Sequence, residues 1–504
     1  MLLSRRGMLI AGILFLSVSC YASDTPKTVS LTILHTNDTH GHLLPYSYPS
    51  GSDPTSETAH LSVWRDIGGA ARRATLVNRI RAEKGHATLV IDAGDINDGT
   101  PFSVEYHGEA DIASMNAIGY DVACPGNHDF NIPFPQVLKN RDAAQFAYLC
   151  ANVRLKDGGS SVFKQFVIKD VSGIKVAFFG LTTVDGATYP GAKSTVNIAD
   201  PVAEAKQLVP LLRKQSDIII AVTHIGVMED QRLAREVPGI DVIVGGHSHT
   251  MLPDGLSAVS TPGSDLVRPT IIVQNFQWAG TLGRLDLSFQ QIGSRWRINK
   301  FTEKLLPITS ALKDDRKTAA VVAKYWDPIK TKYAVVLGTA SDDFTERGDD
   351  FAHYNLVADV IHETMKTEFD IENVGGVRAP LVKGPITYGD MFTMDPFGNT
   401  VVTFKISGSD LKALLAKAVP AVSGIRYEVQ NGLLTAATIN GKPIVDNVVY
   451  VGSTNSYLAS QPEMKSATEK VDTKRARLDL VMEYIRSKKT VSPSYDGRRK
   501  ITIP

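Results

Sequence analysis

The chain has 504 residues, which is long enough for two or three ordinary domains. Hydrophobic residues make up 43% and charged residues 21%, a balance typical of a soluble globular protein. The formal net charge is only +1, and no basic stripe with interleaved aromatic residues is found. The composition therefore does not favour a protein that binds a nucleic-acid polymer.

The first residues have the pattern of a targeting segment. Arg5 and Arg6 precede an apolar run, Met8–Val18, that is too short to span a bilayer and is followed by small residues. The pattern predicts an export signal over residues 1–22. We therefore expect an exported protein, periplasmic or extracellular, without a transmembrane span.

Two other interpretations of this segment stay open. Ser4–Leu9 is similar to a twin-arginine export motif, which would allow metal loading in the cytoplasm. Cys20 could instead carry a lipid anchor, although Ser17 is a poor fit three residues before it.

Two cysteines, Cys124 and Cys150, remain after removal of this segment. Each ends an apolar stretch, so we expect buried thiols. A disulfide between them stays open in an oxidising compartment, but the predicted fold does not depend on one.

An α/β domain is predicted over residues 24–305, because short apolar runs rich in β-branched residues alternate there with polar or helix-periodic stretches. Five runs are continuously apolar, as expected for strands buried on both faces. They are Val29–His35, Ala87–Ile91, Asp121–Ala123, Asp217–Thr223 and Asp241–Val244. Further strands are expected at Val176–Leu181, Thr270–Gln274 and Arg284–Phe289.

Residues 300–335 change character and predict an amphipathic helical stretch, with a linker or hinge over 306–336. A second α/β domain is expected over residues 337–504. Its predicted helices are Asn355–Glu368 and Gly408–Ala418, and its strands are Thr400–Ile406 and Val448–Ser453.

Ligand-type side chains follow each of the five apolar strands. The segments are Asn37–Gly41, Asp92–Asp95, Gly126–Asp129, Thr223–Gly226 and Gly245–His249. Because the carboxyl ends of parallel strands in an open α/β sheet face one crevice, we expect these side chains to meet. A single histidine at a strand end is usually a polar cap, but five clusters in this order predict a metal site.

The residue types indicate the chemistry of that site. Imidazole and carboxylate suit borderline divalent ions such as manganese, iron, cobalt or zinc, and a carboxylate can bridge two of them. Two ions roughly 3.5–4 Å apart clamp the attacking and leaving oxygens of a displacement at phosphorus.

The chain resembles the calcineurin-like metallophosphoesterases in the series Asp-x-His, Gly-Asp, Gly-Asn-His-Asp, His and Gly-His-x-His. Its second half resembles the C-terminal domain of the bacterial 5'-nucleotidases at Asn373–Arg378, Ile386–Asp390 and Pro396–Asn399. The resemblance covers almost all of the chain after the export signal. It implies a four-layer αββα metallophosphoesterase domain joined to an α/β substrate-binding domain.

The resemblance also implies a ligand set for two divalent ions, with Asp95 as the bridge between them. One ion would be held by Asp38, His40 and His249, and the other by Asn127, His224 and His247. Asp92 and Asp129 are expected to orient ligands or cap turns. His42 matches a position that is often polar in the family, and a solvated loop histidine is the alternative to a role in the site.

By the same resemblance, His128 lies beside the metals as a general acid toward the leaving oxygen. The family normally pairs this histidine with an aspartate three residues later, and here that position is Asn131. An asparagine can orient the ring but brings no negative charge, so we expect a less efficient acid step.

The second domain is expected to bind the substrate. The resemblance assigns the phosphates to Arg347 and Arg378, whose guanidinium groups suit phosphate oxygens. It assigns a stacked nucleobase to Phe397 and Tyr457, and polar contacts to Asn373 and Asn399.

This chain departs from the family pattern at two places in that domain. Asp343 stands where the family has a further arginine, and Ser460–Glu463 replaces a Gly-Gly-Asp-Gly segment that contacts ribose. Both departures concern positions that the family uses to bind its substrate.

The sequence thus predicts a secreted hydrolase with two divalent metals that releases phosphate from nucleoside 5'-monophosphates. On the same scaffold, a UDP-sugar diphosphatase, a 2',3'-cyclic nucleotide phosphodiesterase/3'-nucleotidase and a sulfur-ester hydrolase are alternatives. A nucleotide-binding protein with lost or weak catalysis is the alternative of another class.

Overall fold

The computed structural model describes residues 28–48, 65–84, 87–259 and 269–502. The predicted export signal, the twin-arginine motif and Cys20 lie outside this part of the chain. Within it, no helix combines the length and apolar character that crossing a bilayer requires. Cys124 and Cys150 are buried and are not joined in a disulfide.

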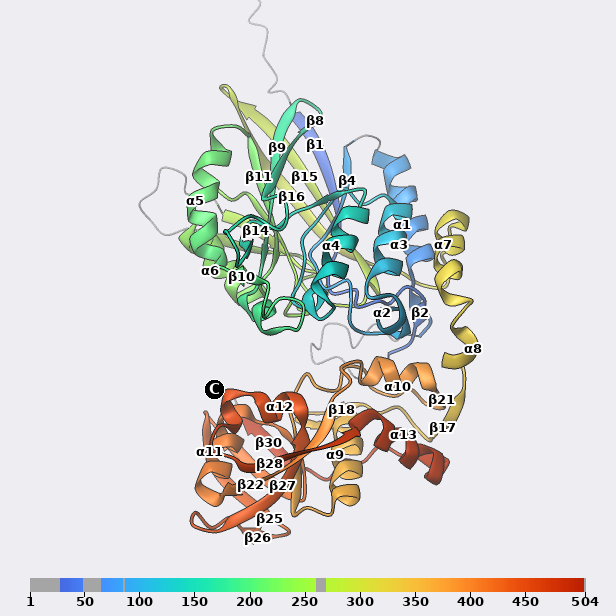
Figure 1. Ribbon diagram of the computed structural model, residues 1–504. Helices are drawn as coiled ribbons and strands as arrows, with labels where there is room; N and C mark the ends of the chain where they lie inside the picture. The colour runs from blue at the N-terminus through green and yellow to red at the C-terminus, as the bar shows by residue number, and fades with distance from the viewer. Residues whose placement is uncertain (1–27, 49–64, 85–86, 260–268, 503–504) are drawn as a thin grey trace, which may run out of the picture.

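Two six-stranded sheets form the centre of the first domain (Figure 1), with the strand orders β16-β15-β1-β4-β5-β6 and β13-β14-β12-β11-β9-β8. The strands of the first sheet are β1 (Thr28–Thr36), β4 (Thr88–Asp92), β5 (Val122–Ala123), β6 (Ala147–Tyr148), β15 (Thr281–Ile292) and β16 (Arg295–Pro307). Those of the second are β8 (Phe166–Val171), β9 (Ile174–Thr182), β11 (Ile218–His224), β12 (Val242–Gly245), β13 (Leu256–Val259) and β14 (Pro269–Val273). Side chains from both sheets, including Ile33 and Val244, share one buried apolar core.

Helices cover the outer face of each sheet, which makes the four-layer αββα arrangement that the resemblance implied (Figure 1). The first sheet is covered by α1 (Ala70–Lys84), α3 (Glu109–Ile118), α4 (Phe134–Ala143) and α7 (Arg316–Trp326), near the short α2 (Pro101–Tyr106). The second is covered by α5 (Pro201–Arg213) and α6 (Val227–Glu236).

Helix α5 shows how the local sequence sets these outer layers. The Asp200 side chain accepts a hydrogen bond from the Ala203 backbone N–H, and Pro201 occupies the first turn, where its missing N–H costs nothing. Its buried residues recur at helical spacing, so one stripe of the helix faces the sheet. They are Val202, Ala205, Leu208, Val209 and Leu212.

The five motif-bearing strands are divided between the two sheets, so the expectation that one open sheet would gather them was wrong. Strands β1, β4 and β5 run parallel in the first sheet, and β11 and β12 run parallel in the second. The two sets end on the same side of the sandwich, which faces the second domain (Figure 1). The buried-strand prediction itself is confirmed, since every residue of β4, β11 and β12 is buried.

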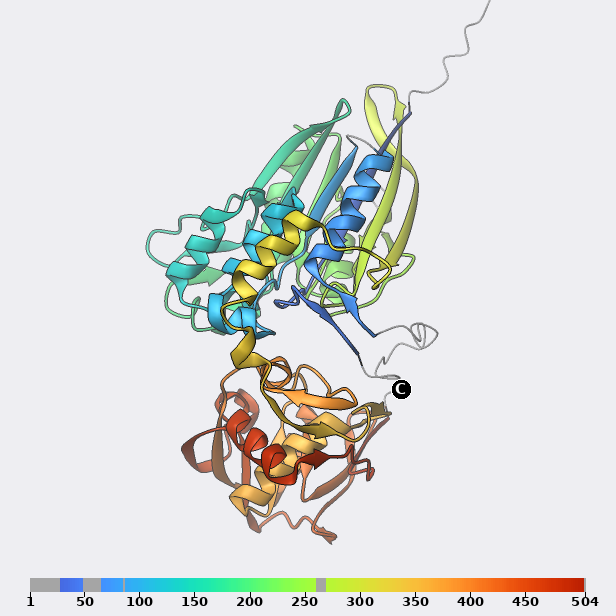
Figure 2. The ribbon, with the colours of Figure 1, turned by 90° about the vertical axis from the view of Figure 1, so that its right-hand side faces the viewer.

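The segment between the domains differs in part from the predicted helical stretch. Residues 300–307 belong to β16, which pairs along its length with β15 as an antiparallel hairpin. The helical periodicity belongs to α7, which contributes Val322 and Tyr325 to the core beneath α1 and α3 (Figure 2). The short α8 (Lys330–Tyr333) follows and leads to β17 (Val336–Ala340).

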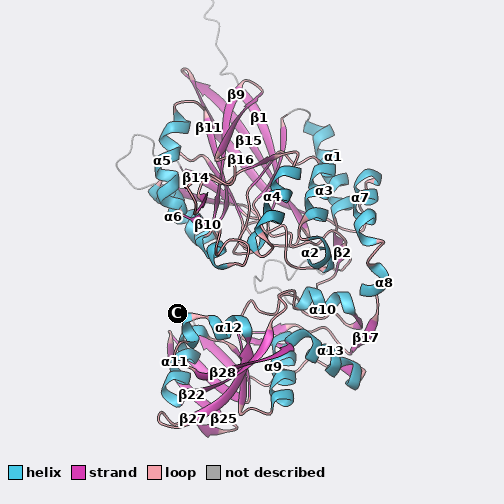
Figure 3. Ribbon diagram, in the orientation of Figure 1, coloured by secondary structure: helices cyan, strands magenta, loops and turns pink. Residues whose placement is uncertain are grey.

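The second domain is built on a five-stranded sheet of order β23-β20-β27-β22-β28 (Figure 3). Its strands are β20 (Phe369–Glu372), β22 (Thr400–Ser407), β23 (Ala421–Ser423), β27 (Val449–Asn455) and β28 (Thr468–Ala476). A four-stranded sheet contains β24 (Ile425–Gln430), β25 (Leu433–Ile439), β26 (Lys442–Pro443) and β30 (Arg499–Thr502). Smaller pairings involve β17, β18 (Glu346–Arg347), β19 (Asp350–Phe351), β21 (Gly384–Thr387) and β29 (Thr490–Val491).

The helices of this domain are α9 (Ala352–Met365), α10 (Tyr388–Met394), α11 (Gly408–Ala418), α12 (Ser456–Ser460) and α13 (Arg477–Lys488). The two helices predicted from the sequence appear as α9 and α11, and the two strands as β22 and β27. Helices α9 and α13 share one apolar core with β17, and α11 packs into a second core over β22.

Candidate active site

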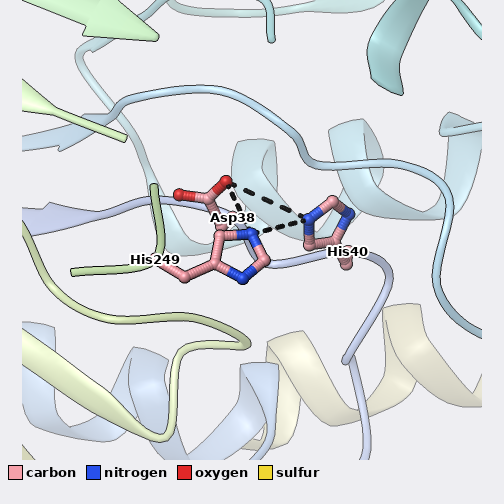
Figure 4. Close-up of side chains that lie close together, drawn as sticks. All are labelled: Asp38, His40 and His249. Atoms are coloured by element: carbon pink, nitrogen blue, oxygen red, sulfur yellow. Dashed lines mark hydrogen bonds and ion pairs between the residues drawn. The ribbon is translucent and has the colours of Figure 1, made fainter. Parts of the chain in front are cut away.

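Three of the predicted ligands form a first cluster at the end of the sandwich. The Nε2 atom of His249 lies 3.2 Å from Oδ1 of Asp38 and 3.3 Å from Nε2 of His40. Figure 4 shows Asp38 and His40, from the segment after β1, converging with His249, from the segment after β12. Their donor atoms all lie within 4.8 Å of one another, which is close enough for one ion to bind all three.

A second cluster contains Asp95, His224 and His247, again with donor atoms within 4.8 Å of one another. Nε2 of His224 lies 3.1 Å from Oδ2 of Asp95. The amide oxygen of Asn127 lies 3.2 Å from the same His224 nitrogen and 3.0 Å from Nδ1 of His247. Asn127 thus joins this cluster as its neutral oxygen donor.

The carboxylate of Asp95 lies between the two clusters. Its Oδ2 atom, already close to His224, is 3.7 Å from Nε2 of His40 in the first cluster. One oxygen therefore faces a histidine of each cluster, which is the arrangement a bridging carboxylate needs.

The backbone at the ligands is held in an uncommon conformation. Five of the seven have positive φ angles: Asp38, His40, Asp95, His247 and His249. Such backbone costs about 1–3 kcal/mol per residue outside glycine and persists where the surroundings enforce it. Gly126 is also restricted by close packing, because a Cβ atom there would lie 2.1 Å from Oδ1 of Asp95.

Hydrogen bonds fix the direction of both carboxylates. Oδ2 of Asp38 accepts bonds from the Asn37 side chain at 2.7 Å and the His247 backbone N–H at 3.0 Å. Oδ1 of Asp95 accepts from the His128 backbone N–H at 2.8 Å. In each carboxylate the other oxygen is left facing the histidines.

The histidine rings are fixed in the same way. Nδ1 of His40 donates to the Asn97 carbonyl at 2.9 Å, and Nδ1 of His224 donates to the Ala93 carbonyl at 2.7 Å. These bonds direct the Nε2 lone pairs into the site, as is usual for histidines that bind metals.

Two buried carboxylates give the clusters a negative charge that a cation would neutralise. Asp38 and Asp95 are fully buried, at 0% and 1% exposure. Burial would lower the pKa of His224, but the carboxylates of Asp95 and Asp38 outweigh it and raise that pKa to about 10. Divalent cations would neutralise the negative charge of the same two carboxylates, so the donor set fits a pair of ions.

The neighbour of His128 is not the one that the sequence predicted. Nδ1 of His128 lies 2.7 Å from Oδ2 of Asp98, and Asn131 donates from Nδ2 to that same oxygen at 2.7 Å. Asn131 itself brings no negative charge, but the carboxylate of Asp98, which the sequence analysis did not name, lies at this ring. Asp98 lies on the loop after β4, 30 residues away in sequence, so the motif spacing gave no signal for it.

Tyr189 is a second neighbour that the sequence analysis missed. Its hydroxyl accepts a hydrogen bond from Nδ2 of Asn127 at 3.1 Å and lies 3.5 Å from Nε2 of His128. Because the Asn127 amide nitrogen is bound there, its oxygen faces His224 and His247. Tyr189 follows a 3-10 turn outside every motif, and no local pattern marks it.

Two predicted substrate residues of the second domain reach the metal ligands. Nη2 of Arg378 donates to Nε2 of His40 across 2.7 Å, and the Phe397 ring lies 6.0 Å from the His128 ring. The Arg378 guanidinium also lies 5.7 Å from the centre of the Phe397 ring. These contacts bring the substrate-facing residues to the two clusters.

The other predicted substrate residues contact their own domain. The Arg347 guanidinium stacks on Tyr495 at 3.9 Å. Oδ1 of Asn373 accepts from Asn455 at 2.9 Å. Oδ1 of Asn399 accepts from the Tyr457 backbone N–H at 3.1 Å, so Asn399 fixes the start of α12.

Tyr457, on α12, has 49% of its surface exposed. Of the two family departures, Asp343 pairs with Arg65 of the first domain. Glu463 lies 3.5 Å from Lys417.

The remaining candidates have defined partners. Asp92 accepts from Thr36 at 2.6 Å. Asp129 accepts four backbone bonds, from Asp95, Ile96, Asn97 and Gly126. His42 is buried and stacks on Trp278 at 4.3 Å, so it is not a solvated loop histidine.

Comparison with known proteins agrees with this geometry. Residues 31–251 match the family model of the calcineurin-like phosphoesterases, and residues 336–465 match that of the 5'-nucleotidase C-terminal domain. A 5'-nucleotidase of Vibrio cholerae is 30% identical over 497 residues, which cover 87% of this chain and 86% of that protein. The chain belongs to the 5'-nucleotidase family.

Other 5'-nucleotidase relatives extend the comparison. Protein UshA of Yersinia enterocolitica is 30% identical over 528 residues, or 92% of each protein. The crystal structure of a 5'-nucleotidase precursor from Thermus thermophilus matches with a TM-score of 0.83 at 27% identity, over 94% of this chain and 99% of that one. The chain is thus a metallophosphoesterase, a phosphoric ester hydrolase of the 5'-nucleotidase type.

Proposed function

We propose that this protein is an exported 5'-nucleotidase that uses two divalent ions to release phosphate from nucleoside 5'-monophosphates. The observation that carries the proposal is the contact between domains. Arg378 and Phe397 of the second domain lie against His40 and His128 of the first. A cationic and an aromatic side chain at the metal ligands match a substrate that has a phosphate and a base.

In this proposal seven residues hold the ions: Asp38, His40 and His249; Asn127, His224 and His247; and Asp95 between them. Manganese, iron, cobalt or zinc fits these nitrogen and oxygen donors. Ions held there would supply Lewis-acid stabilisation of charge on phosphoryl oxygens and a more acidic water.

The protein's own groups do the rest. His128 gives a proton from Nε2 to the leaving oxygen, and Arg378 binds the remaining phosphate charge. Arg347 binds phosphate together with Arg378. Phe397 and Tyr457 bind the base by stacking, while Asn373 and Asn399 supply polar contacts. Nε2 of His40 now accepts a hydrogen bond from Arg378, so an ion held by that nitrogen would displace the guanidinium and free it for phosphate oxygens.

The substrate domain is proposed to move about a hinge within the linker of residues 306–336. Because α7 packs into the core of the first domain, the turning point is expected after Trp326, around α8. Tyr333, on α8, donates from its hydroxyl to Glu105 of the first domain at 2.7 Å and marks the contact that such motion would change.

The test is metal analysis of the purified protein together with a phosphate-release panel. Adenosine 5'-monophosphate, a UDP-sugar and a 2',3'-cyclic nucleotide are compared with added manganese, cobalt or zinc. We expect about two ions per chain and the fastest release from the 5'-monophosphate. A faster reaction on either of the other substrates would replace the proposed substrate class, and calorimetric binding without product would indicate a nucleotide-binding protein instead.

Export is tested separately. N-terminal sequencing of the protein recovered from outside the cytoplasm should begin after Ala22. A start at Cys20, or loss of membrane association in a Cys20→Ser variant, would instead show a lipid anchor.

A further inference from the structure

The ring of His128 lies beside a carboxylate that comes from outside its own sequence motif. Position 131, where the resemblance places an aspartate, holds an asparagine, while a carboxylate reaches the ring from position 98. Both side chains meet at a single atom, because His128 Nδ1 and Asn131 Nδ2 each lie 2.7 Å from Oδ2 of Asp98. A carboxylate is thus present beside the ring, but it comes from the loop after β4 and not from position 131.

We propose that Asp98 is the positioning residue for His128 and that Asn131 acts through Asp98 by holding its carboxylate. This inference rests on the proposed function, in which His128 protonates the leaving oxygen. The hydrogen bond to Asp98 holds the ring proton of His128 on Nδ1, so Nε2 is the nitrogen that gives and takes a proton. The hydrogen bond between Nδ1 and Asp98 also fixes the orientation of the ring at this short distance.

The loop around Asp98 is built to hold the carboxylate in place. Its backbone N–H donates to Oγ of Ser103 at 2.9 Å, and its φ angle is 75°, in the left-handed region. Asp98 and His128 are both buried, with 9% of each side chain exposed. Among the described residues, Asp98 has no other ion pair, so orienting His128 is the task that its position serves.

The step that depends on this pair can be written in full. The oxygen of a water molecule bonds to phosphorus while the bond from phosphorus to the leaving oxygen breaks. The electron pair of that bond stays on the leaving oxygen, which takes the proton from Nε2 of His128. The attacking water releases one proton, which balances the one that the ring regains.

The experiment compares Asp98→Asn, Asn131→Asp and the double exchange D98N/N131D on two substrates. Asparagine suits position 98 because it tolerates a left-handed backbone better than most residues. With a nucleoside 5'-monophosphate, whose alkoxide needs a proton, Asp98→Asn should lower kcat by about 10²-fold or more with little change in KM. With p-nitrophenyl phosphate, whose leaving group needs no proton, the loss should be less than about 5-fold.

The double exchange should restore at least about a tenth of the wild-type kcat on the nucleotide, because the carboxylate and the amide only trade places. Asp142→Asn removes an exposed carboxylate elsewhere in the domain and should change neither substrate. Equal losses on both substrates, or a double variant no better than the single one, would overturn the proposal.

A readout without turnover separates this inference from the proposed function. In the metal-free protein, nitrogen NMR of the His128 ring should show the Nδ1-protonated form, and Asp98→Asn should shift it. Unchanged ring signals would refute the role of Asp98 even in an active enzyme. An inactive wild type with shifted ring signals would refute the proposed function and leave the role of Asp98 standing.

Discussion

The two halves of the site are held in different ways. His224 and Asp95 of the first domain are 0% and 1% exposed, and hydrogen bonds fix the direction of each. Tyr457 of the second domain is 49% exposed and is positioned through its backbone by Asn399. The ion-binding half is therefore preorganised by the fold, whereas the substrate-facing half lies on a surface that can vary while its domain stays folded.

The largest effect is expected where the two clusters share one side chain. Asp95→Asn keeps the size of the side chain but removes the bridging charge, so phosphate release should fall by about 10³-fold or more and the metal content should drop. Phosphate release and metal analysis on the same sample measure this. His107→Asn replaces an exposed histidine of the same domain and should change neither quantity. Full activity in Asp95→Asn would contradict a preorganised metal site.

The second domain contains a buried ion-pair network around Arg477, which stabilises the fold of this domain. Arg477 is fully buried and donates to Asp395 at 2.7 Å, to the Gly376 carbonyl at 2.6 Å and to Glu372. Arg477→Met leaves two buried carboxylates unpaired, so the free energy of unfolding of this domain should fall by about 3–5 kcal/mol. Denaturant unfolding measures this loss.

A matched change tests whether burial causes that effect. Arg426 is half exposed and pairs with Asp496 at 3.1 Å, so Arg426→Met should cost less than about 1 kcal/mol. Equal losses in the two variants would show that the buried network does not hold the domain together.

A smaller effect is expected for the aromatic face in the substrate half. Phe397→Leu keeps an apolar side chain but removes stacking worth about 1–3 kcal/mol, so KM for a nucleotide should rise about 5- to 100-fold with kcat nearly unchanged. Steady-state kinetics test this, with p-nitrophenyl phosphate as the substrate without a nucleobase. A fall in kcat on both substrates would show that Phe397 supports the ion-binding half of the site and does not only stack on the base.

A pH-dependent effect concerns the buried carboxyl of Asp230, which bonds Thr223, the residue before His224. Burial raises the pKa of Asp230 to about 8, and its Oδ1 accepts from Thr223 at 2.6 Å. The pKa of Asp230 is higher in the folded protein than in the unfolded chain, so proton binding by this carboxyl stabilises the fold. This contribution is full below the unfolded pKa near 4 and is lost as pH rises to about 8. Relative to Asp230→Asn, wild-type unfolding free energy should fall by roughly 1.4 kcal/mol per pH unit in that window.

Chemical unfolding at pH 6, 7 and 8 measures this slope. Asp142→Asn, which removes an exposed carboxylate elsewhere in the domain, should leave this slope unchanged. Parallel curves for wild type and Asp230→Asn would show that Asp230 is ionised in the folded protein.

The metal ligands could be predicted from sequence because each follows a strand that is recognisable by itself. A continuous apolar run marks β11, and His224 at its end is placed by the strand alone. The substrate residues could be named only by resemblance, because an exposed tyrosine such as Tyr457 has no pattern that separates it from ordinary surface. The end of β16, residues 300–307, was included in a predicted helical stretch because its mixed polar residues show no clear period of two.

The sequence by itself determined the α/β class, the buried strands and the polar segments that end them, since these are properties of neighbouring residues. Only the tertiary structure decided which strands belong to which of the two sheets, that Arg378 meets His40, and that Asp98 accompanies His128. Each of these depends on the packing of segments far apart in the chain. Local periodicity does not encode that packing, because many arrangements of the same elements share it.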